Sequence, residues 1–299
     1  MPSLRDIRRK IKSVSSTEQI TKAMKMVAAA RMRRSQSAIL SARPFADKMQ
    51  ELIREVGAVR RAGQEEEALA AVRGFFESPA DGPVGLVLIT ADKGLCGAFN
   101  ATLLRAALER ISSNRGRKVY LALVGRKGRD FVRRLSGMDC EVVVELAGIF
   151  PKVGFQHAEV LGEAVLDSYF KRGMSRWYAI YNEFKNAAQQ RLVCSPLLPV
   201  AAPDGAPLAA GGKTDFSYEP GAPRLLQALL PRFVKAQLYR MLLESQAAEL
   251  AARMNAMDAA SKNAAELRET LNMQANRQRQ ALITREIAEL VGGAEALAA

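Results

Sequence analysis

The stretch SVSSTEQITKAMKMVAAARMRRSQ, residues 13–36, decides the fold. Good helix formers such as Ala, Met, Lys, Arg and Gln dominate it, so it predicts a helix. Its apolar run ends in three alanines, 28–30, which are followed by Arg31, Arg33 and Arg34. A helix of small and cationic residues lacks the broad apolar stripe that packs on a globular core. Its partner must therefore come from elsewhere in the chain or from other proteins.

The helical pattern extends far beyond this stretch. Ser3 and Asp6 form a capping box at its start, and the pattern continues to Gly57, interrupted only by Pro44. About 53 residues at 1.5 Å each give a length on the order of 80 Å, more than the diameter of a domain of this size. The helix is therefore expected to project. Two successive apolar stripes are predicted along it: Leu4, Ile7, Ile11 and Val14, then Ile20, Met24 and Val27.

A second long helix is predicted from Pro223 to about Val291. Pro231 is expected to end a short first segment or to kink the helix, and glycines 292–293 are expected to cap it. Alanines dominate its middle, so two such helices could approach closely but would bury little apolar area. These features predict an antiparallel coiled coil, a thin rod that other proteins surround.

Between the two long helices, short apolar segments with the pattern of strands alternate with segments that have a helical pattern. This alternation predicts a Rossmann-like α/β domain with a mostly parallel sheet, so the fold class is α/β with a long antiparallel coiled coil. The chain divides into an N-terminal helix (1–57), a connector with the α/β domain (58–222) and a C-terminal helix (223–299). Strands are predicted at 84–90, 118–124, 140–146, 176–184 and 191–200, helices at 98–113, 126–135 and 156–173, and a loop at 201–222.

The net charge of +13 implies an acidic neighbour: nucleic acid, an anionic membrane or an acidic protein. Residues 1–57 hold 13 Lys/Arg against 5 Asp/Glu, a balance of +8, whereas residues 224–299 hold 10 against 8, a balance of +2. No aromatic residue interleaves with the cations of residues 1–44, which disfavours nucleic acid. No apolar run is long enough to span a membrane. A transit peptide is rejected because the N-terminal helical pattern continues unbroken.

Catalytic and metal sites are not expected. The three cysteines, Cys96, Cys140 and Cys194, show no CxxC spacing, which argues against a zinc site and a disulfide framework. His157 is the single histidine, so a His-based metal site or catalytic triad is excluded, and it is expected to be a polar side chain at a helix start. No acid–base pair stands out, and no cofactor is predicted.

Two glycine-containing segments resemble phosphate-binding motifs but do not satisfy them. GGKT at 211–214 would need a glycine where Pro207 stands and a preceding strand. GLCG at 94–97 lacks the spacing of a dinucleotide fingerprint. The latter is interpreted as a tight strand-to-helix turn.

Three segments together resemble the gamma subunit of the F-type ATP synthase. Ala98, Ser261 and the pair Leu290–Val291 depart from the family pattern, and none of these departures is disabling. The segments are IRRKIKSVSSTEQITKAMKMVAAARMRRSQ (7–36), ITADKGLCGAFN (89–100), and AARMNAMDAASKNAAEL (251–267) with NRQRQALITREIAELVGGAEAL (276–297).

This resemblance implies a central rotating shaft that couples proton flow through the membrane c ring to the catalytic beta subunits. The implied partners are the alpha and beta subunits, epsilon and the c ring, with one copy per complex and no nucleic acid. It also implies a non-catalytic, peripheral protein at the cytoplasmic face of a bacterial inner membrane. From the residues alone, a coiled-coil scaffold, a basic nucleic-acid-binding rod and an enzyme built on the sheet remain alternatives, the last being least favoured.

The resemblance further implies which side chains meet the beta subunits. Cations of the N-terminal helix and the turn after the first strand would lie near an acidic lever segment, and residues of the C-terminal helix would hydrogen-bond to loops. The implied contact residues are Met24, Lys25, Arg31, Arg33, Arg34, Lys93, Cys96, Arg253, Arg279, Gln280 and Thr284.

Overall fold

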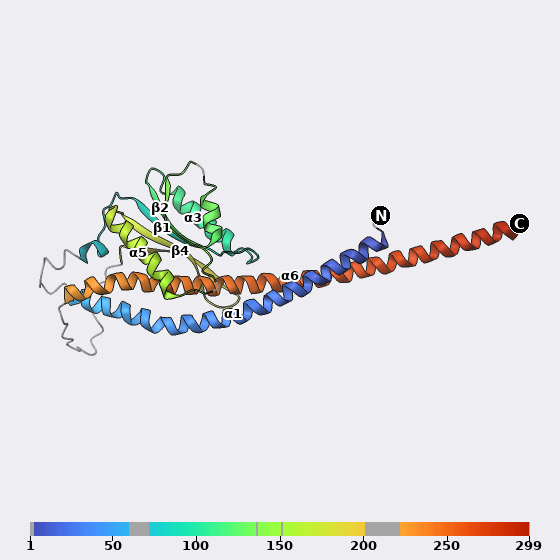
Figure 1. Ribbon diagram of the computed structural model, residues 1–299, viewed down its shortest axis with the longest axis horizontal. Helices are drawn as coiled ribbons and strands as arrows, with labels where there is room; N and C mark the ends of the chain where they lie inside the picture. Colours follow the sequence, from blue (N-terminus) through green and yellow to red (C-terminus); the bar gives the residue numbers. More distant parts are fainter. Residues whose placement is uncertain (1–2, 60–71, 136, 151, 201–221, 299) are drawn as a thin grey trace. The chain divides into compact units, whose positions relative to one another are not determined.

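The computed structural model describes residues 3–59, 72–135, 137–150, 152–200 and 222–298 (Figure 1). By packing, the chain forms two compact units. One consists of Met1–Ala29 with Arg253–Ala299, and the other is Ala30–Ala252. The helices α1 (Leu4–Val59) and α6 (Ala222–Ala298) each contribute to both units.

Both long helices continue through the prolines that were expected to interrupt them. Pro44 lacks the backbone N–H that would donate to the carbonyl of Leu40. Both residues are exposed, so water can donate a hydrogen bond to that carbonyl oxygen instead. Pro231 lies inside α6, so the expectation that it ends a helix is wrong. Leu226 and Leu230 are almost fully buried around it. Burial worth about 1.5–3 kcal/mol for each such side chain outweighs the roughly 3 kcal/mol cost of an internal proline.

The predicted end of the second helix is also wrong. α6 runs on through Gly292 and Gly293 to Ala298. Neither glycine has the positive φ of a helix-ending residue, and both are exposed. The helix-forming alanines that follow explain the continuation, because two glycines cost only about 1 kcal/mol each in a helix.

The second unit holds a five-stranded sheet in the order β3-β2-β1-β4-β5. The first four strands run parallel, with Val84 of β1 opposite Val119 of β2 and Arg176 of β4. β5 pairs antiparallel with β4 at one edge. The strands are β1 (Val84–Ile89), β2 (Val119–Val124), β3 (Cys140–Leu146), β4 (Arg176–Phe184) and β5 (Gln190–Leu198).

Three shorter helices connect these strands: α3 (Phe99–Ser112), α4 (Arg126–Val132) and α5 (Phe155–Lys171). The predicted fold class is therefore confirmed, with every predicted strand present to within two residues. In the described part of the connector, residues 72–76 are helical, which the sequence pattern did not predict. The predicted loop at 201–222 and the GGKT segment lie outside the described residues, except for residue 222, where α6 begins.

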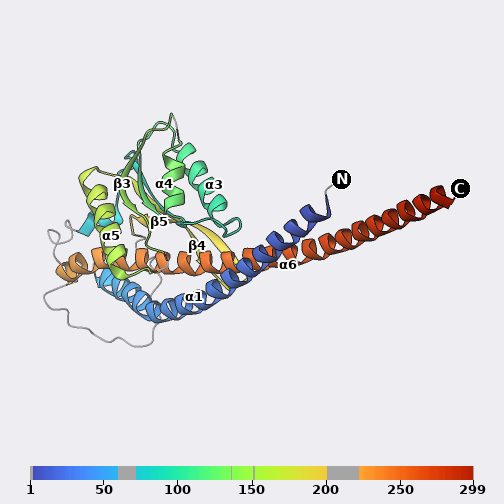
Figure 2. The same cartoon turned by 45° about the vertical axis from the view of Figure 1, so that its right-hand side comes forward.

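Both faces of the central strands are buried, as expected for a parallel sheet. One face packs against α5, the first part of α6 and Met49 and Ile53 of α1. Leu86 and Leu88 alternate to the opposite face, where Leu103 of α3 is also fully buried. Figure 2 shows the sheet between α5 on one side and α3 and α4 on the other. The largest side chain in the core is Trp177, which has no exposed surface.

Candidate interaction surfaces

In the first unit, the seam of α1 follows the alternating three- and four-residue spacing of a coiled coil. Its buried and half-buried positions include Leu4, Ile7, Ile11, Val14, Glu18, Thr21, Lys25 and Ala28. The first predicted stripe is thus confirmed, but the second is wrong for two of its members. Ile20 is 57% exposed and Val27 is 51% exposed. Polar residues occupy the seam there, so hydrophobicity alone pointed to the wrong face.

Two ion pairs cross this seam and show that the helices run antiparallel. Lys25 Nζ lies 2.6 Å from Asp258 Oδ1, and Arg268 Nη1 lies 3.1 Å from Glu18 Oε2. The earlier residue of α1 therefore pairs with the later residue of α6. The hydrogen bond from Lys25, together with a second from Lys262, lowers the pKa of Asp258. These pairs set the register in a seam that has few large apolar side chains.

The predicted contact residues of α1 differ in how exposed their side chains are and in whether they already form ion pairs within the chain. Arg31, Arg33 and Arg34 are all exposed, and the described residues contain no ion pair or hydrogen bond that engages their side chains. Met24 is half-buried. Lys25 is half-buried and occupied by Asp258, so an external acidic group would have to compete with an internal one.

The predicted contact residues of α6 are mostly exposed. Arg279, Gln280 and Thr284 face solvent, whereas Arg253 is half-buried. The Thr284 hydroxyl donates to the Gln280 carbonyl at 2.9 Å, within the helix. Arg279 also lines a pocket of about 250 Å³, and Arg8 lines the same pocket from α1. Two guanidinium groups at one pocket suit an acidic side chain of another protein.

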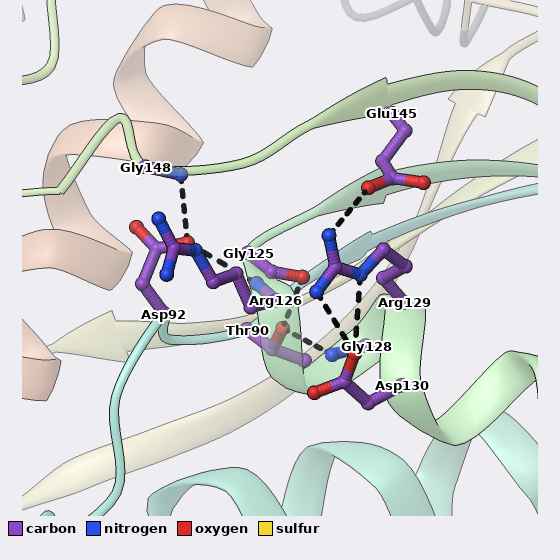
Figure 3. A network of polar contacts seen from close by, with 9 residues as sticks. All are labelled: Thr90, Asp92, Gly125, Arg126, Gly128, Arg129, Asp130, Glu145 and Gly148. Atoms are coloured by element: carbon purple, nitrogen blue, oxygen red, sulfur yellow. Dashed lines mark hydrogen bonds and ion pairs between the residues drawn. The ribbon is translucent and has the colours of Figure 1, made fainter.

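In the second unit, Asp92 ties together the loops that follow three neighbouring strands. Its Oδ1 accepts hydrogen bonds from the backbone N–H of Arg126 at 3.1 Å and of Gly148 at 2.8 Å. Its Oδ2 accepts one from the N–H of Phe150 at 3.4 Å. Figure 3 shows the carboxylate of Asp92 between the loops after β1, β2 and β3. The loops at the carboxyl edge of the sheet are therefore held in one arrangement.

Thr90 closes the same edge beneath Asp92 (Figure 3). Its hydroxyl donates to the Val124 carbonyl at 2.9 Å and accepts from the N–H of Gly128 at 2.8 Å. Gly125 has φ +87°, and a Cβ there would lie 2.1 Å from the Thr90 carbonyl oxygen. Doubly wound sheets bind ligands at this edge. Here the chain's own carboxylate and hydroxyl engage backbone amides that could otherwise face a phosphate.

The segment 94–97 forms a turn between β1 and α3, as its sequence predicted, with Gly97 at φ +58°. Asn100 holds this turn from inside. Its side-chain oxygen accepts from the N–H of Ala91 at 3.0 Å, and its amide nitrogen lies 3.2 Å from the sulfur of Cys96. Lys93 is exposed, but Cys96 is only 2% exposed. Of the two predicted contact residues in this turn, Lys93 is the one at the surface.

The remaining residues considered as sites have structural surroundings. The Nδ1 atom of His157 accepts a hydrogen bond from the N–H of Gly154 at 2.9 Å, which confirms its expected place at a helix start. Cys96, Cys140 and Cys194 are free thiols. Within the described residues no group of His, Cys, Asp and Glu side chains could hold a metal ion. Nor does any described helix combine the length and apolar character that a bilayer crossing requires.

A sequence model of the ATP synthase family matches residues 3–297. The ATP synthase gamma chain of Elusimicrobium minutum is 44% identical over 306 aligned residues, covering 99% of each chain. The chain belongs to the ATP synthase gamma chain family. The gamma chain of Anaeromyxobacter sp. (strain Fw109-5) is 42% identical, covering 99% of this chain and all of that one.

Chains of solved ATP synthase structures share the fold of this chain. A chain from the central stalk and c ring of the Tetrahymena thermophila mitochondrial ATP synthase is 27% identical, with a TM-score of 0.59. The match covers 81% of this chain and 99% of that chain. A chain of the Euglena gracilis mitochondrial ATP synthase shares the fold at 20% identity, with a TM-score of 0.65 and coverage of 98% and 94%.

Some residues that organise these surfaces were missed from the sequence. Asp92, Asn100 and Asp258 were not singled out, although all three lie within the segments that carry the resemblance to the gamma chain family. A carboxylate directly after a buried strand was a usable signal for Asp92, because such groups meet loop amides at the carboxyl edge of a sheet. No comparable signal marked Asp258, whose partner lies 233 residues away in the sequence.

Proposed function

We propose that this chain is the central rotating shaft of an F-type ATP synthase, which couples proton flow through a membrane c ring to conformational cycling of catalytic beta subunits. Membership in the gamma chain family over residues 3–297 is the observation that carries this proposal. The antiparallel helix pair, with its exposed basic and polar outer surface, supports it. In this proposal the chain itself performs no chemistry.

The partners proposed are the alpha and beta subunits of the catalytic ring, the epsilon subunit and the c ring, with one copy of this chain per complex. The proposed location is peripheral, at the cytoplasmic face of a bacterial inner membrane. The proposed division of labour follows the three sequence segments: helices 1–57 and 223–299 as the shaft, and 58–222 as the domain that meets epsilon and the c ring.

A shaft that turns inside a ring of other subunits must be pushed without being trapped. Charge–charge attraction acts over several ångströms and requires no interlocking shape, so exposed cations suit a pushing surface. Arg31, Arg33 and Arg34 meet this requirement because no described residue neutralises them. We therefore place them, with Lys93, against the acidic lever segment of the beta subunits.

The remaining proposed contact residues differ in how accessible their side chains are to the beta subunits. Arg279, Gln280 and Thr284 are exposed and available to the loops of beta subunits. Half-buried members of the set, Met24, Lys25 and Arg253, would contribute through their accessible edges. Cys96 would act by shaping its turn, since its side chain is buried.

Reconstitution tests the proposed function directly. The chain is mixed with alpha and beta subunits of a bacterial ATP synthase and analysed by size-exclusion chromatography with an ATPase assay. We expect one stable complex that contains a single copy of this chain and hydrolyses ATP. A homodimer that binds neither the alpha nor the beta subunits would instead indicate a structural scaffold. Salt-sensitive binding to DNA or RNA would indicate a nucleic-acid-binding rod.

The contact surface is tested by changing Arg31, Arg33 and Arg34 together to Glu. Reversing three charges should lower proton pumping per ATP hydrolysed in reconstituted vesicles, because attraction to carboxylates becomes repulsion. Lys22, which is exposed on the same helix, provides the control when changed to Glu. Unchanged coupling in the triple variant would remove these arginines from the proposed surface.

A further inference from the structure

The sheet of the second unit has the topology in which ligands usually bind at the carboxyl edge. Its chain passes from β1 to β2 on one side, whereas β4 lies on the other side of β1. Doubly wound sheets hold ligands outside the carboxyl ends of the strands, where the strand order reverses in this way. Such ligands often carry phosphate, which backbone amides of the adjoining loops bind. In this chain the loop after β1 places a carboxylate at that edge, on Asp92 (Figure 3).

Three backbone N–H groups from two loops converge on the carboxylate of Asp92. Those of Arg126 and Gly148 donate to Oδ1 at 3.1 and 2.8 Å, and that of Phe150 donates to Oδ2 at 3.4 Å. Arg126 follows β2, whereas Gly148 and Phe150 follow β3. Several amides around one pair of oxygens form the contact set that protein loops offer to a bound oxyanion. The carboxylate therefore takes the part of an anion that belongs to the chain itself.

The surroundings of this carboxylate suit an anion in two further respects. Gly148 has φ +78°, a left-handed conformation that is typical of the backbone nests that bind anions. A Cβ built on Gly148 would lie 3.9 Å from Nη2 of Arg126, so the guanidinium of Arg126 is close to these amides. Among the described residues, the Arg126 side chain forms no ion pair. It can therefore hold an oxyanion together with the amides.

We propose that Asp92 is a built-in substitute for a bound phosphate: its carboxylate fills the oxyanion position of the sheet and holds the loops after β1, β2 and β3 in one arrangement. The position is closed to phosphate in the parent chain and becomes an oxyanion site when the carboxylate is removed. The purpose of this arrangement rests on the function proposed above. A shaft that works beside sites for ATP, ADP and phosphate must keep its loops independent of the concentrations of those ligands.

The test removes the carboxylate with and without opening the space that it fills. Asp92→Ala opens the position, whereas Asp92→Asn fills it with an uncharged group of the same shape. Asp92→Ala should lower the melting temperature of the full chain by about 4–8 °C, because three amides lose a charged acceptor. Inorganic phosphate at about ten times its dissociation constant should raise the melting temperature of this variant by about 3–6 °C. Acetate should act in the same direction, because it returns a carboxylate to the position.

The controls separate this position from general effects of anions. The parent chain and Asp92→Asn should gain little from phosphate, because their position is filled. Asp139→Ala removes an exposed carboxylate elsewhere, so it measures any general attraction of phosphate to a more basic chain. Sodium chloride at equal ionic strength measures screening. Calorimetric titration with phosphate should detect a site in Asp92→Ala that the controls lack. Asp92→Ser, which also opens the position, takes the place of Asp92→Ala if the alanine variant does not fold.

A second readout tests the purpose of the carboxylate in the whole complex. Proton pumping per ATP is measured in reconstituted vesicles for Asp92→Ala and divided by that of the parent at the same phosphate concentration. This ratio cancels the action of phosphate on the catalytic sites. It should rise as phosphate is added, because the anion returns the loops to their arrangement, and it should stay constant for Asp92→Asn. A constant ratio for Asp92→Ala would overturn the proposed purpose.

Each outcome on the isolated chain decides the inference. If Asp92→Ala is as stable as the parent, the carboxylate does not hold the loops and the inference is overturned. If the variant is less stable but gains no more from phosphate and acetate than the controls, the position is not an oxyanion site, which also overturns it. Failure of the parent chain to form a complex with alpha and beta subunits would overturn the proposed function alone, because the melting temperatures do not depend on that complex.

Discussion

The two compact units of this chain are stabilised in contrasting ways. The unit built on the sheet buries large apolar side chains completely, among them Trp177, Leu86 and Leu161. The unit formed by residues 1–29 and 253–299 buries few, and its seam includes Ala28, Thr21 and two ion pairs. Large buried side chains stabilise by about 1.5–3 kcal/mol each, whereas alanines and partly exposed ion pairs contribute far less.

This difference indicates that the sheet unit provides most of the stability of the fold, whereas the helix pair provides a surface for other subunits. The core of the sheet unit can hold a fixed fold and keep loops such as 91–98 in place. The helix pair gains little from its own seam and retains a large outer surface with exposed cations and exposed apolar residues such as Ile20 and Met26. A helix pair with that composition suits a shaft whose binding energy comes from surrounding subunits.

The largest expected effect lies in the core of the sheet unit. Trp177 has no exposed surface, and its indole N–H donates to the sulfur of Met174 at 3.1 Å. Trp177→Ala should lower the free energy of unfolding by about 3–5 kcal/mol through lost burial and a cavity. Urea denaturation of the isolated chain measures this loss. A loss as small as that of a surface substitution would contradict the contrast between the units.

The next effect is a loss of stability at high pH. Burial, reinforced by the carboxylate of Glu244, raises the pKa of Tyr181 to about 12. The unfolded phenol loses its proton near pH 10, so between about pH 10 and 12 the unfolded state binds fewer protons than the folded state. This contribution to the free energy of unfolding is therefore fully present below about pH 10 and is lost between about pH 10 and 12, a decrease of about 3 kcal/mol.

Tyr181→Phe is the control for this loss. Without the phenol, this contribution to the pH dependence should vanish, and the slope of stability against pH should flatten in denaturation curves above about pH 10. An unchanged slope would assign the alkaline loss to other groups.

A smaller effect tests the close approach of the helices. Ala28 is 1% exposed in the seam, so Ala28→Leu should overpack it and destabilise the chain by about 1–3 kcal/mol. Ala23 is exposed on the same helix, and Ala23→Leu should change stability by less than about 0.5 kcal/mol. Thermal unfolding followed by circular dichroism measures both. Equal effects at the two positions would mean that the seam is not tightly packed.

The smallest expected effect concerns an ion pair of the seam. The side chains of Glu18 and Arg268 are 20% and 42% exposed, so Arg268→Ala should cost about 1 kcal/mol or less, and less again at high salt. Exchanging the two charges, with Glu18→Arg and Arg268→Glu, should recover most of the loss. Arg277→Ala, at an exposed position on the same helix, serves as the control. No recovery in the exchanged variant would exclude a pairing role.

Local pattern allowed much of the fold to be predicted. The run VGLVLI became β1 because a continuous apolar run of this length forms a buried parallel strand, whereas CEVVVEL, with its two glutamates, became the half-exposed edge strand β3. Helix ends were predicted less well. Pro231 disfavours a helix locally, but core packing around it outweighs this cost, and Gly292 disfavours a helix, but the helix propensity of the following alanines outweighs it.

The candidate surfaces were predictable as segments but not as side-chain arrangements. The exposed Arg31, Arg33 and Arg34 could be identified from composition, because three cations near an alanine run have no core to enter. The burial of Cys96, the pairing of Lys25 with Asp258 and the exposure of Val27 could not, because each depends on which face of a helix or turn meets a distant segment.

The sequence by itself determined the elements and their class: two long helices of small and charged residues around an alternation of strands and helices. It could do so because helix propensity and hydrophobic period act between near neighbours. Only the tertiary structure decided that the stretch 13–36 has Thr21 and Lys25 in its seam, and that Asp92 accepts hydrogen bonds from the loops after β2 and β3. Those outcomes depend on partners far away in sequence, and their energies exist only once the chain has folded.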